Sequence, residues 1–385
     1  MIPRVVLGTR GATRLRAGHP WIFRTDIRHE PGEWPGLVRL EDERGRGLGT
    51  ALHSPASEIR VRWLAPEGVD VDATWWREMV RRALARRAGI DATAYRVVHA
   101  EGDGLPSLIV DRFGDCAVAQ LLSAGLEAVR GEVVDAIRDV LAPKGLLLRN
   151  DAPVRERERL PRGVEPAFGT VPQTIEVREA AVRYLAAPWT GQKTGAFLDQ
   201  RENRVLVGAL AGGRCLDAFA YHGGFALHLA KGGAVEVTAV EISPEALRYV
   251  NEAAALNGVA IRGIEANAFD WLRAEADGRA RYEVIVLDPP AFAKDKRSLE
   301  RALAGYKELN LRAMRMLAPG GWLFTCSCSH HVHRGAFFAM LGEAAQDAGR
   351  RLQLVEMRGA GADHPELLTV PETGYLKGAL LRALD

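Results

Sequence analysis

The sequence predicts an α/β protein with a doubly wound C-terminal sheet of about seven strands, preceded by a small β-barrel module and a compact α+β middle domain. From about residue 186, short apolar runs alternate with helical patterns, which is typical of a parallel sheet covered by helices. Before about residue 70, short apolar runs are separated by glycine, proline and charged turns. The predicted domain ranges are therefore 1–70, 71–185 and 186–385.

The N-terminal module is predicted from short strand-like runs, which are Val5–Leu7, Trp21–Phe23, Leu37–Leu40 and Ile59–Leu64. Trp21 and Phe23 stand beside basic residues, as aromatic residues often do in RNA-binding proteins. We nevertheless interpret these two side chains as part of the core of a small barrel.

The middle domain begins with an amphipathic, arginine-rich helix over Val71–Ala88. Two strands, Tyr95–Ala100 and Leu108–Asp111, flank a Glu-Gly-Asp-Gly-Leu-Pro turn cluster and predict a hairpin. The sequence of this domain contains no catalytic constellation.

The C-terminal domain shows seven strand-like runs, which are Arg214–Ala220, Val235–Val240, Ile261–Ala266, Tyr282–Leu287, Trp322–Cys326, Leu352–Met357 and Tyr375–Leu381. Asp288-Pro289-Pro290 ends the fourth run, because proline has no backbone N–H with which to continue a central strand. A helical pattern over Leu299–Leu317 makes the fourth and fifth strands parallel, with their carboxyl ends on one edge. We therefore expect Asp288 to face the same crevice as Cys326 and Cys328.

The composition is that of a globular protein without a membrane anchor. Among 385 residues, 47% are hydrophobic and 26% charged, and no apolar run approaches the ~20 residues of a membrane span. The N-terminus has no signal-peptide core, and four cysteines in a chain of this length indicate the reducing cytoplasm. Residues 1–28 carry six arginines and one aspartate, which favours a surface facing a polyanion such as nucleic acid over a merely solvated basic face.

The strand ends also indicate a cofactor. Gly223-Gly224 replaces the wider G-x-G-x-x-G spacing that a dinucleotide pyrophosphate requires. Glu241, after the second strand, is placed to accept ribose hydroxyls, and Asn267-Ala268-Phe269, after the third, is placed to hold an adenine edge. Asp217 is placed to pair with a cationic amine. A nucleoside with a charged amino-acid tail, S-adenosylmethionine, fits this set.

Several motifs together resemble one family, and they are Thr190-Gly191-Gln192-Lys193-Thr194-Gly195, Asp199-Gln200-Arg201, Asn203-Arg204, Gly223-Gly224-Phe225, Leu287-Asp288-Pro289-Pro290-Ala291-Phe292, Gly305-Tyr306-Lys307-Glu308-Leu309-Asn310 and Thr325-Cys326-Ser327-Cys328-Ser329-His330-His331. The chain resembles, over nearly its whole length, the bacterial 23S rRNA (cytosine-carbon-5) methyltransferases that carry a PUA domain. The resemblance implies a PUA module at the N-terminus and a class I, Rossmann-like methyltransferase domain at the C-terminus.

The resemblance also implies a site. Together with the strand ends, it predicts cofactor contacts from Gln192, Lys193, Thr194, Gln200, Arg201, Asp217, Phe219, Ala220, Tyr221, Gly223, Gly224, Glu241, Ile242, Asn267, Ala268, Phe269, Asp288 and Pro289. No metal is expected, although the compact Cys326–His333 run leaves zinc as a minor alternative. Lys294, Lys296 and Arg297 are candidates for contact with RNA phosphates.

Carbon 5 of cytosine is a weak nucleophile, and a thiolate that adds to carbon 6 activates it. By resemblance to the family, Cys326 is the nucleophile, with Cys328 as its rival, and Asp288 stabilises charge at the ring nitrogen. Many such enzymes carry a second cysteine directly after Asp-Pro-Pro, where this chain has Ala291. Release of the enzyme then falls to Cys328 or to a water molecule.

The predicted reaction is 5-methylcytosine formation in 23S rRNA, with the rRNA or a large-subunit precursor as partner and a homodimer as one oligomeric state. One alternative is methylation of an amine or another base position, for which an Asp-Pro-Pro edge suffices without cysteine. Another alternative is a non-catalytic RNA-binding assembly factor that retains the fold.

Overall fold

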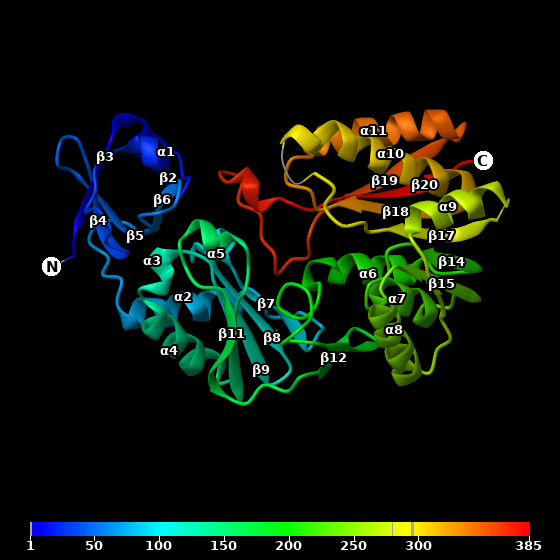
Figure 1. The fold of residues 1–385 in the computed structure, drawn as a ribbon, viewed down its shortest axis with the longest axis horizontal. Helices are drawn as coiled ribbons and strands as arrows, with labels where there is room; N and C mark the ends of the chain where they lie inside the picture. Colours follow the sequence, from blue (N-terminus) through cyan, green and yellow to red (C-terminus); the bar gives the residue numbers. More distant parts are fainter. Residues whose placement is uncertain (1, 279, 294–295) are drawn as a thin grey trace. The chain divides into compact units, whose positions relative to one another are not determined.

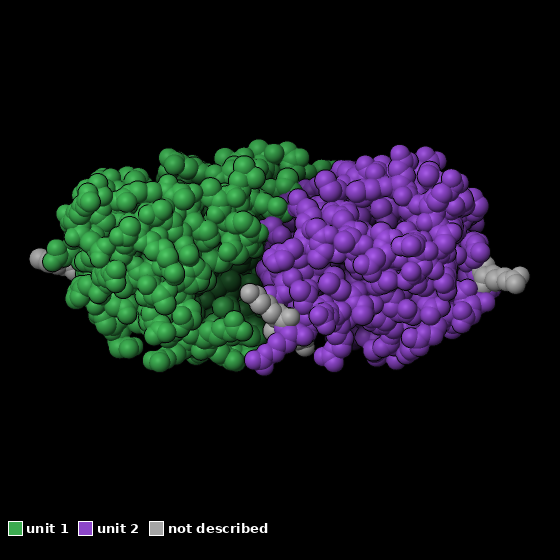
Figure 2. Space-filling view, turned by 90° about the horizontal axis from the view of Figure 1, so that it is seen from above, with its two compact units in different colours: residues 1–177, 186–198, 362–373 green, residues 178–185, 199–361, 374–385 purple. Residues whose placement is uncertain are grey.

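The structure is a computed structural model that describes residues 2–278, 280–293 and 296–385. The chain forms two compact units, coloured separately in Figure 2. The first comprises Met1–Val177, Ala186–Leu198 and Ala362–Thr373, and the second comprises Arg178–Leu185, Asp199–Gly361 and Gly374–Asp385. These units do not coincide with the ranges 1–70, 71–185 and 186–385, which remain predictions about domain boundaries.

The N-terminal part of the first unit is a six-stranded sheet in the order β2-β6-β5-β4-β1-β3. Its strands are β1 (Arg4–Leu7), β2 (Trp21–Phe23), β3 (Ile27–His29), β4 (Gly36–Asp42), β5 (Gly47–His53) and β6 (Ile59–Ala65). Helix α1 (Thr9–Arg16) was not predicted, because its polar sequence buries only Gly11 and Ala12 and shows no apolar stripe.

The assignment of Trp21 and Phe23 to the barrel core was wrong. Strand β2 buries Ile22 completely and leaves its two aromatic neighbours half-buried. The Trp21 indole donates a hydrogen bond to Glu101 Oε1 at 2.9 Å, and the guanidinium of Arg14 lies 4.6 Å from the centre of the Phe23 ring. Side chains alternate along a strand, so Trp21 and Phe23 share the face opposite to Ile22, and that face is only partly covered.

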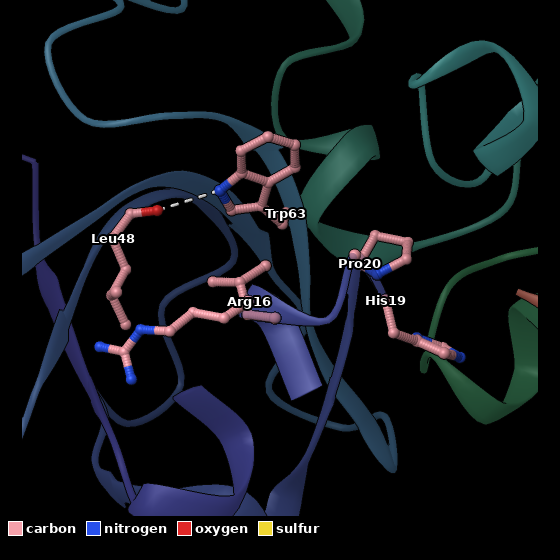
Figure 3. Close-up of a pocket in the computed structure, with 7 residues that line it drawn as sticks. Arg16, His19, Pro20, Leu48 and Trp63 are labelled. Atoms are coloured by element: carbon pink, nitrogen blue, oxygen red, sulfur yellow. Dashed lines mark hydrogen bonds between the residues drawn. The ribbon is translucent and has the colours of Figure 1, made fainter. Parts of the chain in front are cut away.

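A pocket of about 250 Å³ opens in this module beside the end of α1 (Figure 3). The Trp63 indole in its wall donates to the carbonyl of Leu48 at 3.0 Å, and Arg16 at its rim pairs with Asp42 at 2.9 Å. The remaining lining residues are Leu15, Gly18, His19 and Pro20.

The rest of the first unit is built on a five-stranded sheet in the order β11-β10-β9-β8-β7. Strands β7 (Ala94–His99) and β8 (Leu108–Phe113) pair antiparallel, which confirms the predicted hairpin. The other elements are β9 (Cys116–Leu121), β10 (Gly145–Asn150), β11 (Gly163–Gly169), α2 (Ala73–Ala85), α3 (Ala124–Glu127), α4 (Arg130–Leu141) and α5 (Val154–Arg157). The chain passes from one unit to the other within a two-stranded ribbon of β12 (Ile175–Glu179) and β13 (Val182–Ala186).

The second unit contains the predicted seven-stranded sheet, in the order β16-β15-β14-β17-β18-β20-β19. Pairing is parallel from β16 to β18, and β20 then pairs antiparallel with both β18 and β19. The strands are β14 (Arg214–Asp217), β15 (Glu236–Glu241), β16 (Arg262–Glu265), β17 (Tyr282–Leu287), β18 (Leu317–Ser327), β19 (Leu352–Arg358) and β20 (Lys377–Ala383).

Helices cover both faces of this sheet (Figure 1). They are α6 (Arg201–Ala209), α7 (Gly224–Lys231) and α8 (Pro244–Asn257) on one face, and α9 (Ala268–Asp277), α10 (Leu299–Met316) and α11 (Arg334–Ala348) on the other. Strand residues alternate between the two cores: Val284 and Val286 pack with the first group, and Ile285 and Leu287 with the second. Within the described part of the chain, no helix combines the length and apolar character needed to cross a bilayer.

Candidate active site

Asp288 and Cys326 meet where two neighbouring parallel strands end. Leu287 of β17 lies opposite Thr325 of β18, so the next residue of each strand reaches the same level. The Cys326 thiol donates a hydrogen bond to Asp288 Oδ1 across 2.9 Å, and its sulfur lies 3.6 Å from the carbonyl oxygen of Leu287. The predicted proximity of thiol and carboxylate is therefore confirmed.

A third side chain reaches the sulfur from α6. Cys326 belongs to the core on the α6–α8 face of the sheet, and α6 begins directly after Gln200. The side-chain amide of Gln200, which is 2% exposed, donates from Nε2 to Cys326 Sγ at 3.2 Å. The sulfur thus lies between a carboxylate acceptor and an amide donor.

This environment keeps the thiol protonated. Cys326 is fully buried, and burial is the main cause that raises its pKa well above the ordinary value of 9.0. The negative charge of Asp288 and the hydrogen bond to it raise the pKa further, and the Gln200 donor lowers it. A proton acceptor is consequently needed to form a thiolate here, and Asp288 is already in contact.

Helix α10 ties the two strand-end loops together. The hydroxyl of Tyr306, fully buried, shares a hydrogen bond of 2.9 Å with Ser329 Oγ in the loop after β18. The same Ser329 oxygen accepts the backbone N–H of Ala293, in the loop after β17, at 3.2 Å. Burial raises the pKa of Tyr306, so its hydroxyl remains a donor at neutral pH.

Cys328 lies two residues beyond Cys326 and is half-buried. The buried ammonium of Lys377 supports this loop by donating to the carbonyl oxygens of Ser329 at 2.6 Å and Tyr375 at 2.7 Å. Burial lowers the pKa of His330, whose ring lies 5.8 Å from that of Tyr375. In the described ranges, no three histidine, cysteine or acidic residues are grouped as metal ligands.

The turn after β14 has an unusual backbone conformation and packs closely against α8. Gly223 has φ +80°, and a Cβ there would approach Val250 Cγ2 to 3.0 Å, so glycine is required. Tyr221 also has a positive φ of 47°, and its N–H donates to Glu241 Oε2 at 2.9 Å. Glu241 Oε1 accepts from Ser243 N at 2.9 Å, and each carboxylate oxygen keeps a second lone pair for a hydroxyl donor.

Asp217 is a buried acid at the end of β14. Its Oδ2 accepts the backbone N–H of Ala226 at 3.0 Å, and among the described residues its Oδ1 has no hydrogen-bond partner. Burial first, and then the charges of Asp288 and Glu241, raise its pKa to about 7. A cation bound beside Asp217 would offset this cost, as a ligand amine would do.

Comparison with known proteins decides the family. Residues 5–66 match the PUA-like domain family, and residues 153–382 match the S-adenosylmethionine-dependent methyltransferase family. Ribosomal RNA large subunit methyltransferase I of Klebsiella pneumoniae (strain 342) is 35% identical over 398 residues, covering 100% of this chain and 99% of that protein. The protein of the same name from Aeromonas salmonicida (strain A449) is 37% identical over 95% of each chain.

This chain belongs to the ribosomal RNA large subunit methyltransferase I family. It is an S-adenosylmethionine-dependent methyltransferase with an N-terminal PUA-like domain, as the sequence motifs predicted. The fold is shared with a putative SAM-dependent methyltransferase from Streptococcus mutans, with a TM-score of 0.82 and 20% identity over 99% of this chain and 100% of that one. A putative methyltransferase complexed with SAH matches equally well.

The edge of the methyltransferase sheet fits the cofactor at both ends. At one end are the glycine turn and the Asp217 oxygen that has no hydrogen-bond partner within the described part of the chain. At the other, Ile242 directly follows Glu241 and leaves 65% of its surface exposed, which suits contact with a flat base. Asn267 Oδ1 accepts the N–H of Phe269 at 2.9 Å as the N-cap of α9, so the amide group of Asn267 is held at the strand end.

The other predicted contact residues are distributed as follows. Phe219 is half-buried and stacks edge-on with Phe269 at 6.5 Å, whereas Ala220, Ala268 and Pro289 are buried. Arg201 is buried and pairs with Glu202 at 2.7 Å. Gln192, Lys193 and Thr194 belong to the first unit, where Thr194 Oγ1 donates to the buried Asp111 at 2.5 Å. Of the basic residues after Asp-Pro-Pro, Lys294 lies outside the described residues.

Sequence reasoning did not identify the residues whose hydrogen bonds hold the Cys326 thiol and the loop after β18 in place. It assigned Gln200 to the cofactor alone, whereas the structure places its amide on the sulfur of Cys326. Tyr306, Ser329 and Asn203 were noticed only as parts of motifs. The available signal was that these polar residues belong to the recognised motifs. Their burial would have marked them as supports of the thiol, but burial is known only from the tertiary structure.

Proposed function

We propose that this methyltransferase forms 5-methylcytosine in 23S rRNA through a covalent bond between Cys326 and the cytosine ring. The observation that supports this proposal is the 2.9 Å hydrogen bond from Cys326 Sγ to Asp288 Oδ1 at the carboxyl edge of the sheet. A methyltransferase acting on an amine needs a carboxylate or a carbonyl at this edge but no sulfur nucleophile. The names of the relatives from Klebsiella and Aeromonas support large-subunit rRNA as the substrate.

The first step begins with a proton transfer from Cys326 to Asp288. The sulfur then adds to C6 and forms an S–C6 bond, while the ring electron pair moves toward N3 and N3 takes the proton from Asp288. The net charge of the buried site changes little, because one proton passes from the sulfur through the carboxylate to the ring. Gln200 remains a donor to the sulfur throughout.

Bound S-adenosylmethionine would supply an electrophilic methyl group to carbon 5, and S-adenosylhomocysteine would be the leaving group. A base then removes the carbon-5 proton, the C5=C6 double bond forms again, and Cys326 leaves as a thiolate. The N3 proton returns through Asp288 to the sulfur. Ala291 stands where many enzymes of this kind have a cysteine, and the half-buried Cys328 is the candidate group for this release step.

The cofactor contacts are part of the same proposal. Asp217 holds the amine, the Tyr221–Gly224 turn lies beneath the amino-acid tail, Glu241 accepts from the ribose, and Ile242 and Asn267 contact the base. Calorimetry in two buffers of different ionisation enthalpy tests the Asp217 contact: at pH 6 cofactor binding should release close to one proton, because a cation ionises an acid whose pKa is about 7. Asp217→Asn should bind without that release.

The PUA-like domain is proposed to contact the RNA through its arginine-rich first 28 residues. A cytoplasmic location follows from an rRNA substrate. The homodimer remains a prediction, which light scattering coupled to size-exclusion chromatography tests.

The reaction is tested by nucleoside mass spectrometry of 23S rRNA from cells that lack the gene, complemented with the wild type or Cys326→Ala. The wild type should restore one 5-methylcytosine, and Cys326→Ala should restore none. Restoration by Cys326→Ala but not by Cys328→Ala would move the nucleophile to Cys328, and a methyl group on a ring amine would refute the proposal. Naked rRNA, precursor particles and finished subunits are compared in vitro with labelled cofactor to define the substrate.

A further inference from the structure

A chain of hydrogen bonds runs from β19 to the sulfur of Cys326 within the second unit. Arg358 Nε donates to Asn203 Oδ1 at 2.9 Å, and Asn203 Nδ2 donates to Gln200 Oε1 at 2.6 Å. Gln200 Nε2 then donates to Cys326 Sγ at 3.2 Å. Asn203 and Gln200 are 1% and 2% exposed, so water does not compete for these contacts.

Arg358 determines which way the side-chain amides of Asn203 and Gln200 are oriented in this series of hydrogen bonds. A guanidinium can donate but cannot accept, so the group of Asn203 that faces Arg358 must be its oxygen. The Asn203 nitrogen therefore points to Gln200, and it is also held by the carbonyl oxygen of Gly359 at 3.0 Å. Gln200 must accept from that nitrogen with its oxygen, which leaves its own nitrogen facing the sulfur. A flipped Gln200 would place two donors against each other.

We propose that Gln200 is a catalytic residue that stabilises the attacking sulfur of Cys326, and that Asn203 and Arg358 are positioning residues that fix the orientation of its amide. The inference rests on the proposed role of Cys326 as the nucleophile. It revises the expectation that Gln200 serves mainly the cofactor.

The need for such a donor follows from the surroundings of the sulfur. Asp288 is the charged group in contact with it, Cys328 is the neighbouring titratable group, and both disfavour a thiolate. The Gln200 amide is the neighbour that favours the thiolate, and in a buried site a donor to a charged atom is worth more than in water. A neutral amide also stabilises the thiolate without forming an ion pair with Asp288. The Asp288 carboxylate can therefore still accept the proton of the Cys326 thiol.

The test measures the thiol itself, without RNA or cofactor. A small neutral thiol reagent, methyl methanethiosulfonate, modifies thiolates, and the modified cysteine is located by peptide fragmentation. Gln200→Leu should slow modification of Cys326 about tenfold or more across pH 7–9, because a hydrogen bond to a charged group is lost. Cys116, buried in the first unit, is the internal reference. If Gln200→Leu only loosened the packing around Cys326, the reagent would reach the buried thiol more easily and the modification would become faster, which is the opposite of the expected result.

Asn203→Asp is the sharper variant. An aspartate keeps the contact with Arg358 but cannot donate to Gln200, so the Gln200 amide should flip and turn its oxygen toward the sulfur. Modification of Cys326 should slow as in Gln200→Leu, and the double variant should be no slower than Gln200→Leu alone, because Asn203 acts only through Gln200. Arg358→Gln should show a smaller loss, with Arg351→Gln, an exposed arginine directly before β19, as the matched control.

Two results would overturn the inference, and the control for the first is Gln353→Leu, which changes an exposed glutamine of β19. In the first, Cys326 of Gln200→Leu is modified as fast as Cys326 of the wild type or of this control. The other is a large loss of cofactor affinity by calorimetry with an unchanged thiol, which would return Gln200 to the cofactor. A wild type that forms no 5-methylcytosine while Gln200→Leu still slows the thiol reaction would refute the proposed function and leave the donor chain standing.

Discussion

Tyr306 and Ser329 share a hydrogen bond of 2.9 Å that fastens helix α10 to the loop carrying Cys328. Ser329 also accepts from Ala293, so one serine oxygen joins the loops that follow β17 and β18. The relative position of Asp288 and Cys326 therefore depends on a helix that lies on the opposite face of the sheet from Gln200.

Replacing Tyr306 with phenylalanine should lower the turnover rate about tenfold and the free energy of unfolding by only about 1 kcal/mol, because the loops lose one shared bond. Steady-state methylation and chemical unfolding measure the two effects. Tyr282→Phe is the matched control, since that buried hydroxyl donates to Glu275 at 2.8 Å at the opposite end of β17. An equal loss of turnover in both variants would contradict a role in aligning the loops.

Asp288→Asn should reduce single-turnover methylation by about 10²- to 10⁴-fold, the range lost with a general acid–base group. The thiol would lose its proton acceptor, and the ring would lose its proton donor. Removing the negative charge should also lower the pKa of Cys326, but burial, the main cause of the raised pKa, remains. The thiol must then lose its proton to solvent, so the residual activity should rise more steeply with pH than that of the wild type, in which the proton passes internally to Asp288. Asp270→Asn, an exposed acid in α9, is the control. Near-normal turnover in Asp288→Asn would exclude the proton relay.

Asp217→Asn should stabilise the protein at pH 8 and leave its stability at pH 4 nearly unchanged. Burial raises the pKa of Asp217 from 3.8 to about 7, so the native state holds a proton that the unfolded state has released. Stability is then lost as pH rises from about 4 through 7, by roughly 1.4 kcal/mol for each pH unit as an upper limit. Denaturant unfolding at pH 4, 6 and 8 measures the difference. A difference that shrinks toward pH 8 would contradict the raised pKa.

Gly223→Ala should destabilise the second unit more than Gly233→Ala and should weaken cofactor binding at least tenfold. Both glycines have positive φ, 80° and 105°, so both substitutions cost on the order of 1–2 kcal/mol in backbone strain. Only at Gly223 does the added carbon meet a neighbour, Val250, at 3.0 Å, and the turn must move. Thermal unfolding and calorimetric titration with S-adenosylmethionine compare the two. Equal affinities would remove the turn from the cofactor site.

The sequence predicted the second unit well because its signals are local. Periodicity, glycine and proline stops placed the seven strands of the sheet to within a few residues, except that β18 begins at Leu317 and runs through Gly320-Gly321, whereas the sequence predicted its start at Trp322. The Asp288-Pro289-Pro290 stop located the acid at a strand end. The parallel connection was enough to bring Cys326 to the same edge. By contrast, the sequence did not predict α1, because the helix is mostly polar and has no apolar stripe. It also did not predict how far Trp21 is buried, because that depends on the residues that pack against β2, and these are far away in the sequence.

The sequence alone therefore determined where each strand stops and which chemical groups stand at those ends, because chain termination and side-chain alternation act within a few residues. The tertiary structure alone decided that Gln200 donates to the thiol and that Arg358 sets the direction of that amide. These contacts join residues 126 and 155 positions apart, and only the packing of α6 against β18 and β19 brings their donors and acceptors within hydrogen-bonding distance.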